Sequence, residues 1–513
     1  DPVIKAGYNQ MLDFSNEIEN RMRFFYLNLA KIPLRLQPAF LKSDLLKDYR
    51  HFLERAFAWG RHLLNDKEEK ILLLKDSSAY ANWVRMTSGL LGKEEKLVFT
   101  GKRKETRNFG EILGLLENQN KRTRDSAAGA FNEILVKHID VAEAEINSVL
   151  GDKKVNDELR GMKRPDFSRH LEDDVESGMV DVLVRTIAQN FHISEKYYEL
   201  KAKLLGVKAL EYHERNVPYG KLDQRYPYSR AVNLVGTVFR KLDPDFYQIF
   251  RDFALNGQVD VYPRKSKAHI EFCIHWLIEH PSYILLNYNN QLGDVLTIAH
   301  EFGHAINNEL VRESQNALNF GTTIATTEVA STFMEDFVIG ELFKEAGDEE
   351  KLSLMMMKLD SDVSSIFRQA AAYRFELELH SAFREKGYLS KAEIGALFRK
   401  HMLFYMGRAV RQSPGSENWW VYWSHIRDFF YNYSYASGLL ISKYLQAQVR
   451  QNPLFIHKVK EFMSAGLSAA PEDIFQKVGV DITKRGFWER GLKEIENLLH
   501  STLTLAKKLG KIG

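Results

Sequence analysis

The sequence predicts a mainly helical protein with one small β-sheet, and the spacing of its prolines is the first reason. Only 12 of the 513 residues are proline, and six of these lie between Pro165 and Pro281. Residues 39–164 and 282–413 contain none, and because proline interrupts helices, both blocks are predicted to be mostly helical. The second reason is an alternation of apolar and polar residues near 258–288, between the two blocks, which is typical of strands.

In the first block, apolar side chains recur at helical spacing. Phe131, Ile134, Leu135 and His138 lie on one side of the predicted helix, with charged residues between them. The charged cluster at residues 101–107 is predicted to be a solvated loop, because most runs of surface charge have no further role.

Three short stretches between the blocks predict the strands of a small sheet. Apolar residues alternate with polar ones at 259–261 and 270–274, and a short apolar run occupies 283–286. This sheet directly precedes the segment that carries the candidate chemistry.

Composition gives little reason to expect nucleic acid or a membrane as a partner. Hydrophobic residues make up 44% and charged residues 27% of the chain, and the net charge is +3, which is small for 513 residues. Cys273 is the one cysteine, so no internal disulfide can form. Neither a signal peptide nor a long uncharged apolar run is visible, so we expect a cytoplasmic protein.

Residues 294–310 carry the decisive motif, His300-Glu-Phe-Gly-His304. On a helix turning about 100° per residue, the two imidazoles lie about 40° apart and can bind one zinc ion. Glu301 lies at the edge of the same face and can reach a metal-bound water without being a ligand.

Asp294 is the expected N-cap of this predicted helix. An apolar stripe for packing consists of Val295, Ile298, Ala299, Phe302 and Ile306. The alternative is a surface helix that carries two histidines by chance.

A catalytic zinc ion needs a third protein ligand and an open position for water, and Glu328 is the candidate ligand. It follows His304 by 24 residues and lies on the polar stripe of an otherwise apolar helical segment. A carboxylate in such a segment needs a partner, because an unpaired buried charge is very unfavourable. Glu335, two turns later, is positioned to hydrogen-bond a ligand. The alternative for Glu328 is a salt bridge within the core.

These motifs together resemble a known family. His300-Glu-Phe-Gly-His304, then Glu328-Val-Ala-Ser331 and Glu335, look like the oligoendopeptidase F and thimet oligopeptidase family of zinc metallopeptidases. The stretch Tyr283–Tyr288 is similar to the edge strand beside that family's zinc helix. We expect this strand to pair with the backbone of a bound peptide.

The resemblance extends to the last part of the chain. His425 and the segment 430–438 resemble the family's substrate-binding His/Tyr segment, which implies that His425, Tyr435 and Tyr431 act on the substrate. We favour Tyr435 over Tyr431. Without the resemblance, tyrosines beside so many tryptophans indicate core packing.

This resemblance implies an architecture and a substrate class. We expect two helical lobes around a deep substrate channel, with the small sheet beside the zinc helix. Residues 1–164 would form an N-terminal helical region and residues 165–513 the catalytic region, with both lobes contributing to the channel. One zinc ion per chain would hydrolyse internal bonds of short unfolded peptides, with Glu301 as general base and His425 or Tyr435 stabilising the oxyanion.

Two other functions remain open. A zinc carboxypeptidase would share the His-Glu-x-x-His helix, and a peptide-binding protein that has lost catalysis would share the fold. The residues do not distinguish zinc from cobalt or manganese, nor do they give the cleavage preference or the oligomeric state.

Overall fold

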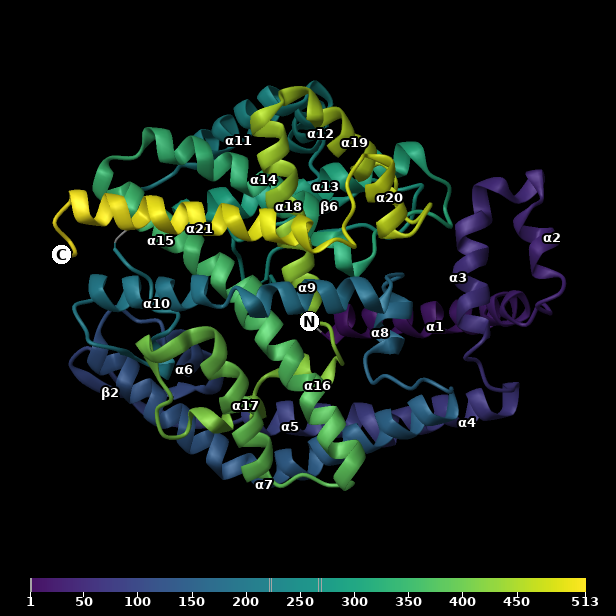
Figure 1. The fold of residues 1–513 in the computed structure, drawn as a ribbon, viewed down its shortest axis with the longest axis horizontal. Helices are drawn as coiled ribbons and strands as arrows, with labels where there is room; N and C mark the ends of the chain where they lie inside the picture. The colour runs from purple at the N-terminus through teal and green to yellow at the C-terminus, as the bar shows by residue number, and fades with distance from the viewer. Residues whose placement is uncertain (1, 221, 223, 266, 269) are drawn as a thin grey trace.

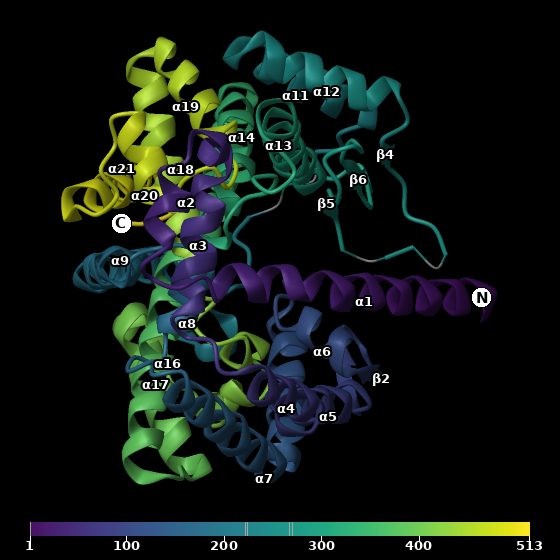
Figure 2. The ribbon, with the colours of Figure 1, turned by 90° about the vertical axis from the view of Figure 1, so that its right-hand side faces the viewer.

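The computed structural model describes residues 2–220, 222, 224–265, 267–268 and 270–513, and most of them lie in helices. Two helical lobes lie above and below a middle layer of helices (Figure 1), and the same division is visible from the side (Figure 2). The prediction of a mainly helical, two-lobed molecule is therefore confirmed, whereas the deep channel stays a prediction.

The upper lobe is formed by helices from residue 228 onward. They are α11 (Tyr228–Leu242), α12 (Pro244–Leu255), α13 (Leu292–Ser314), α14 (Ile324–Glu345), α15 (Asp348–Asp362), α18 (Tyr433–Gln451), α19 (Ile456–Met463), α20 (Pro471–Lys477) and α21 (Arg485–Lys508). Helix α14 packs against α13 on one side and α18 on the other.

The lower lobe combines an early part of the chain with a later one. Its helices are α4 (Asp66–Asp76), α5 (Asn82–Gly92), α6 (Phe109–Leu115), α7 (Lys121–Leu159), α16 (Arg368–Lys386) and α17 (Lys391–Met406). The middle layer contains α8 (Phe167–Glu172), α9 (Ser177–Gln189) and α10 (His192–Leu204). At one side lie α1 (Pro2–Ala30), α2 (Gln37–Leu41) and α3 (Arg50–Gly60), with α1 at the level between the lobes (Figure 2).

The helix predicted around residues 131–138 is confirmed as part of α7. Phe131, Ile134 and Leu135 are fully buried, and His138 is buried with its Nε2 atom 2.8 Å from Glu94 Oε1. The spacing therefore identified the face of α7 that packs into the lower lobe.

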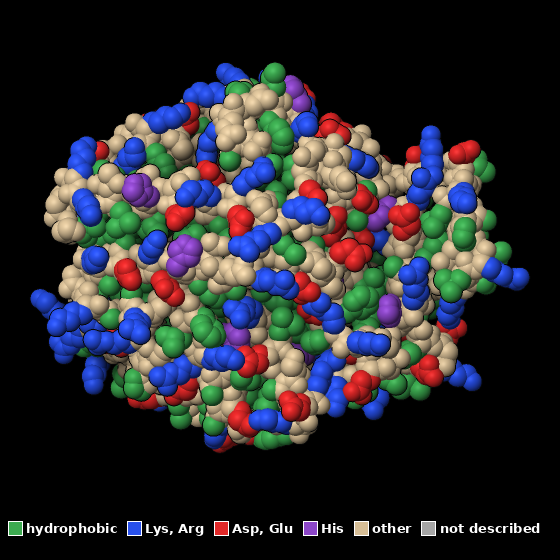
Figure 3. Space-filling model, viewed as in Figure 1, with side chains coloured by type: hydrophobic (Ala, Val, Ile, Leu, Met, Phe, Trp, Pro, Cys, Tyr) green, Lys and Arg blue, Asp and Glu red, His purple; other side chains and the backbone are tan. Residues whose placement is uncertain are grey.

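The prediction of a loop at residues 101–107 is wrong. Strands β1 (Glu95–Thr100) and β2 (Arg103–Asn108) form an antiparallel hairpin, with Gly101 in the left-handed region at its turn. Only Val98 of β1 is fully buried, whereas the β2 side chains stay partly or fully exposed, so the hairpin accepts charge on most of its surface. In Figure 3, acidic and basic side chains are mixed over the face shown, and basic ones gather near β2 at its left edge.

The small sheet lies beside α13 as predicted, but its strand order differs from the expectation. Strands β4 (Val259–Asp260), β6 (Tyr283–Leu285) and β5 (Phe272–Ile274) are adjacent in that order. The expectation of an edge strand at 283–288 is therefore wrong, because Ile284 pairs with Val259 on one side and Cys273 on the other. Ile284 is buried, and a continuous apolar run is typical of a central strand. The edge strand next to α13 is β5.

The remaining two strands, β3 (Leu210–Glu211) and β7 (Val410–Arg411), form a short parallel pair. Buried hydrophobic side chains from both lobes form one continuous core, which extends from Leu91 to Ala506 along the sequence. Within the described ranges, none of the helices combines the length and the apolar character that crossing a bilayer requires.

Candidate metal and catalytic site

Helix α13 presents two histidines to the candidate site. It begins at Leu292, and the Asp294 carboxylate accepts hydrogen bonds from the backbone N–H groups of Asn289 and Gln291 at 2.6 and 2.9 Å. Asp294 therefore lies in the first turn rather than at the N-cap, where we expected it, but it still satisfies the start of the helix. Further along the helix, His300 and His304 lie one turn apart, and their ring centroids are 5.0 Å from each other.

Helix α14 brings Glu328 to these histidines. Glu328 Oε2 lies 3.3 Å from His300 Nε2 and 3.6 Å from His304 Nε2, and the Ser331 hydroxyl donates to the same oxygen at 2.8 Å. One ligand atom from each of the three side chains lies within 4.8 Å of the others. Two ligands about 2 Å from a tetrahedral ion lie about 3.3 Å apart, so this donor set fits a zinc ion.

The site is set in the protein but open to solvent. The His300 and Glu328 side chains are 29% and 30% exposed, and His304 is 19% exposed. A water molecule and a substrate group can therefore reach the ligand atoms.

Two glycines allow the three helices to approach each other closely. A Cβ atom at Gly303 of α13 would lie 2.5 Å from Ser331 Cα and 2.7 Å from the Ala330 carbonyl oxygen of α14. A Cβ atom at Gly438 of α18 would lie 3.1 Å from Glu328 Cβ. The Glu328 segment is therefore enclosed between two backbones that carry no side chain at the points of contact.

Charges within the site shift its pKa values in opposite directions. Burial alone would lower the pKa of His300, but hydrogen bonds and charges from Glu328 and Glu335 raise it to about 10. Burial lowers the pKa of His304 to about 4, against the charge of Glu328. Burial would raise the pKa of Glu328, but His300, His304 and Ser331 hold it at about 2. An ionised Glu328 and a neutral His304 are the forms that bind a metal, whereas His300 would have to release its proton to bind one.

Glu301 differs from Glu328 although both are carboxylates near the same histidines. Burial raises the pKa of Glu301 to about 7, with His300 opposing the shift and Glu328 adding to it, while a backbone hydrogen bond from Cys273 of β5 also lowers it. A carboxyl group that titrates near neutrality is suited to accept and return a proton.

Glu335 lies where the sequence predicted a partner for a ligand. Its Oε2 atom is 3.4 Å from His300 Nδ1, on the opposite side of the ring from Glu328. Such a contact sets the orientation of a ligating imidazole.

The His/Tyr segment forms one cluster near Glu328. His425 Nε2 lies 3.1 Å from the Tyr435 hydroxyl oxygen, and the Tyr431 and Tyr435 ring centroids are 5.3 Å apart. Burial raises the pKa of both tyrosines, and the negative charge of Glu328 contributes, which places both rings within its field. All three side chains are only partly buried, unlike core aromatic residues.

The backbone between His425 and Tyr431 adopts an uncommon conformation. Phe429 and Phe430 have φ values of 43° and 60°, in the left-handed region, although neither is glycine. Such residues cost about 1 to 3 kcal/mol each and persist where surrounding contacts hold them. Sequence reasoning did not detect the side chains that provide these contacts, Glu376 and Arg169, since no local pattern marks them.

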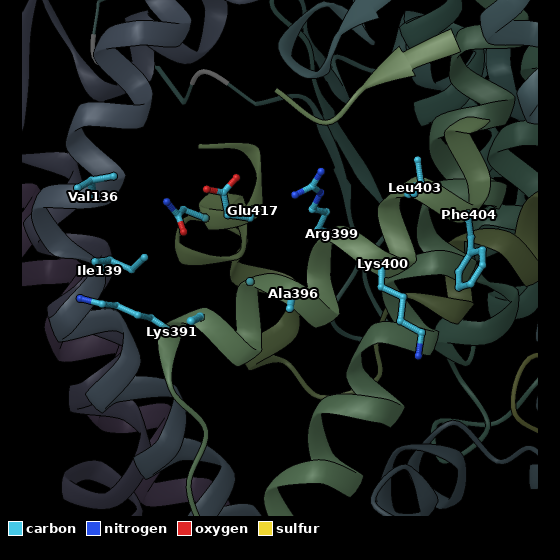
Figure 4. A pocket seen from close by; sticks show the side chains of 12 residues that line it. Val136, Ile139, Lys391, Ala396, Arg399, Lys400, Leu403, Phe404 and Glu417 are labelled. Carbon is cyan, nitrogen blue, oxygen red and sulfur yellow. The ribbon is translucent and has the colours of Figure 1, made fainter. Parts of the chain in front are cut away.

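Two other features do not form comparable sites. Asp125, His213 and Glu214 also lie close enough to share an ion, but Lys121 Nζ and Arg124 donate to Glu214 at 3.0 and 2.7 Å and already neutralise it. A groove of about 810 Å³ lies between α7 and α17 (Figure 4). Among the described residues that line it there is no histidine, cysteine or aspartate, so it offers no metal ligand set of this kind.

Comparisons with known proteins agree with one another. The sequence model of peptidase family M3 matches residues 115–494, and that of oligopeptidase F matches residues 29–92. An oligoendopeptidase F homologue of Lactococcus lactis subsp. lactis is 24% identical over 518 residues, which cover 96% of this chain and 84% of that protein.

Solved structures share the fold. A Chlamydophila abortus protein superimposes with a TM-score of 0.88 at 20% identity, covering 98% of this chain and 84% of that one. Oligoendopeptidase F from Enterococcus faecium gives a TM-score of 0.76 at 17% identity, covering 99% and 88% of the two chains.

Proposed function

Because the chain belongs to peptidase family M3, we propose that it is a zinc-dependent oligoendopeptidase that hydrolyses internal bonds of short unfolded peptides. The observation that carries the proposal is the approach of Glu328 Oε2 to both imidazole Nε2 atoms, at 3.3 and 3.6 Å. His300, His304 and Glu328 would hold one zinc ion per chain and leave a fourth position open.

The proposed roles follow from position and charge. A bound zinc ion supplies Lewis acidity toward a water molecule and the peptide carbonyl group. Glu301 accepts the proton of the attacking water and returns it to the leaving amine, a task that its pKa of about 7 favours. The Tyr435 hydroxyl and His425, which contact each other at 3.1 Å, donate to the developing oxyanion, and Tyr431 supports them from the adjacent position.

The proposed function also includes an arrangement of the chain. Residues 1–164 would form an N-terminal helical region and residues 165–513 a catalytic region, and both lobes would contribute to a substrate channel. Size exclusion by such a channel would restrict the substrates to oligopeptides. We also propose that the protein acts in the cytoplasm, without nucleic acid or a membrane as partner.

One experiment tests the reaction and the metal together. Purified protein is analysed for metal content and assayed with a quenched-fluorescence peptide blocked at both ends, with and without a chelator. We expect cleavage that is lost with the chelator and restored by zinc. A carboxypeptidase would fail on the blocked peptide, and a protein that has lost catalysis would bind the peptide without turnover.

Two substitutions test the assigned roles. Glu301→Gln should retain zinc and lose about a thousandfold or more in kcat, because the proton acceptor is gone. His300→Ala should lose the metal itself. Glu309→Gln on the same helix, and His401→Ala in the lower lobe, are the matched controls and should keep metal and activity. A Glu301→Gln enzyme with normal turnover would exclude Glu301 as the base.

A further inference from the structure

His425 lies in the 3-10 helix at Ser424–Arg427 and Tyr435 lies in α18, and Tyr431 lies in the segment that joins these two helices. Its path includes the two consecutive left-handed residues, Phe429 and Phe430. Because an L-residue with a side chain disfavours this conformation, the segment needs external contacts to keep it.

A single side chain of α16 contacts the segment on both sides of Tyr431. Glu376 Oε1 accepts a hydrogen bond from the backbone N–H of Phe430 at 3.0 Å, and Glu376 Oε2 accepts one from Asn432 Nδ2 at 2.8 Å. The hydrogen bond from Phe430 fixes one of the two left-handed residues. The hydrogen bond from Asn432 fixes the residue that immediately precedes α18.

The surroundings of Glu376 give it no other evident task. Its side chain is fully buried, and both hydrogen bonds that the structure records for it go to this segment. A buried carboxyl group is unfavourable unless its hydrogen bonds are used. Arg169 adds support from the more exposed side, donating to the Asp428 and Phe429 carbonyl oxygens at 3.0 and 3.2 Å.

We propose that Glu376 is a positioning residue, whose two hydrogen bonds hold the segment from His425 to Tyr435 so that the Tyr435 hydroxyl and His425 face the Glu328 side of the site. The proposal rests on the proposed function and deepens it. Donors to an oxyanion act only when they are held in place before the reaction, so a displacement of about 1 Å is expected to lower the rate strongly.

Kinetics of two variants provide the first test. In Glu376→Ala we expect kcat to fall about 10- to 100-fold, while KM changes less than about threefold and the zinc content stays at one per chain. Glu376→Gln should stay within about threefold of the wild-type kcat. Its amide oxygen can accept from Phe430, and once the Asn432 side-chain amide turns over, the glutamine amino group can donate to Asn432 Oδ1, an atom without a hydrogen-bond partner in the structure.

Glu214→Ala is the matched control. Glu214 is a buried carboxylate whose partners, Lys121, Arg124 and the backbone of Glu211, lie outside the segment. Its loss should lower stability without lowering kcat. An equal loss of kcat in Glu376→Ala and Glu376→Gln would overturn the proposal, because positioning by hydrogen bonds predicts rescue in the second.

Amide hydrogen exchange gives a readout that does not depend on activity. Peptides covering residues 426–435 should exchange faster in Glu376→Ala than in the wild type, while those covering residues 292–314 should not change. Unchanged exchange at 426–435 overturns the positioning role whatever the activity is. Faster exchange in a protein that never cleaves peptide would support the role and contradict the proposed function.

Asn432→Ala keeps the test decisive if Glu376→Ala does not fold. This substitution removes the hydrogen bond between Asn432 and Glu376 by changing the donor instead of the acceptor. It should speed amide exchange at residues 426–435 and lower kcat, each by a smaller factor than Glu376→Ala. In the double variant the loss of kcat should be less than the product of the two single losses, because both changes break the same contact.

Discussion

The imidazole of His300 is held between two carboxylates. Its Nε2 atom lies 3.3 Å from Glu328, and its Nδ1 atom lies 3.4 Å from Glu335. In a metal site the contact at Nδ1 fixes the ring orientation and the tautomer, so that Nε2 is presented to the ion.

Glu335→Ala should therefore weaken metal binding without removing a ligand. We expect the dissociation constant for zinc to rise about 10- to 100-fold, while the activity at saturating zinc falls much less. Competition with a fluorescent zinc chelator measures the constant. Glu341→Ala, on the same helix but paired with Lys241 and Lys344, should leave it unchanged. An unaltered constant in Glu335→Ala would mean that the ring is oriented by packing alone.

Some residues of the candidate site can be predicted from the sequence and others cannot, for a physical reason. His300, His304 and Glu301 lie within two turns of one helix, so helical periodicity alone groups them, and Glu328 and Glu335 are likewise related by whole turns of α14. Their catalytic and ligand roles remain predictions. Glu376 could not be predicted, because its contacts with Phe430 and Asn432 join parts of the chain more than 50 residues apart.

At the scale of elements, the close approach of α13 and α14 depends on Gly303. The backbone of α14 occupies the space that any side chain at this position would need, 2.5 Å from Ser331 Cα. Since backbone atoms cannot rotate away as a side chain can, a larger residue must move one helix relative to the other.

Gly303→Ala should therefore destabilise the protein despite the higher helix propensity of alanine. Alanine in a helix gains up to about 1 kcal/mol, but overpacking costs about 1 to 3 kcal/mol, so we expect a net loss in urea unfolding. Zinc affinity should fall as well, because Glu328 moves with α14. Gly340→Ala in α14, where a Cβ atom meets nothing within 4 Å, should be neutral or stabilising. A stabilised Gly303→Ala variant would contradict the close approach.

The two elements whose predictions are wrong have different causes. The hairpin at β1 and β2 buries little beyond Val98, so charge obscures its strand pattern, whereas the expectation of an edge strand at β6 follows the family resemblance although Ile284 pairs on both sides. Local sequence indicates that a segment is a strand, but which strands lie beside it depends on the distant segments that complete the sheet.

At the scale of the whole molecule, a buried ion pair connects the lower lobe to the segment before α18. Arg427 donates from Nε and Nη2 to the two Glu145 carboxylate oxygens at 2.9 and 2.7 Å, and both side chains are almost completely buried. Arg427 also donates to the carbonyl oxygens of Trp420 and Trp423. This cluster joins α7 to a part of the chain more than 250 residues away.

Arg427→Met should destabilise the protein by about 3 to 5 kcal/mol, because it leaves Glu145 charged and buried without its partner. Changing both residues, Glu145→Leu with Arg427→Met, should restore part of the loss. Urea unfolding of the single and double variants measures both effects. Additive losses would show that the two side chains do not stabilise each other.

The enclosure of α14 between α13 and α18 has a consequence for how the protein loses its activity. Helices α13, α14 and α18 pack against one another and all contribute to the continuous core, so Glu328 cannot separate from the two histidines by a small local opening. Peripheral parts such as the β1–β2 hairpin can fray in a sub-global opening while the centre keeps its shape. The ligand set thus belongs to the packed centre of the chain, and inactivation by denaturant is expected to coincide with global unfolding rather than precede it.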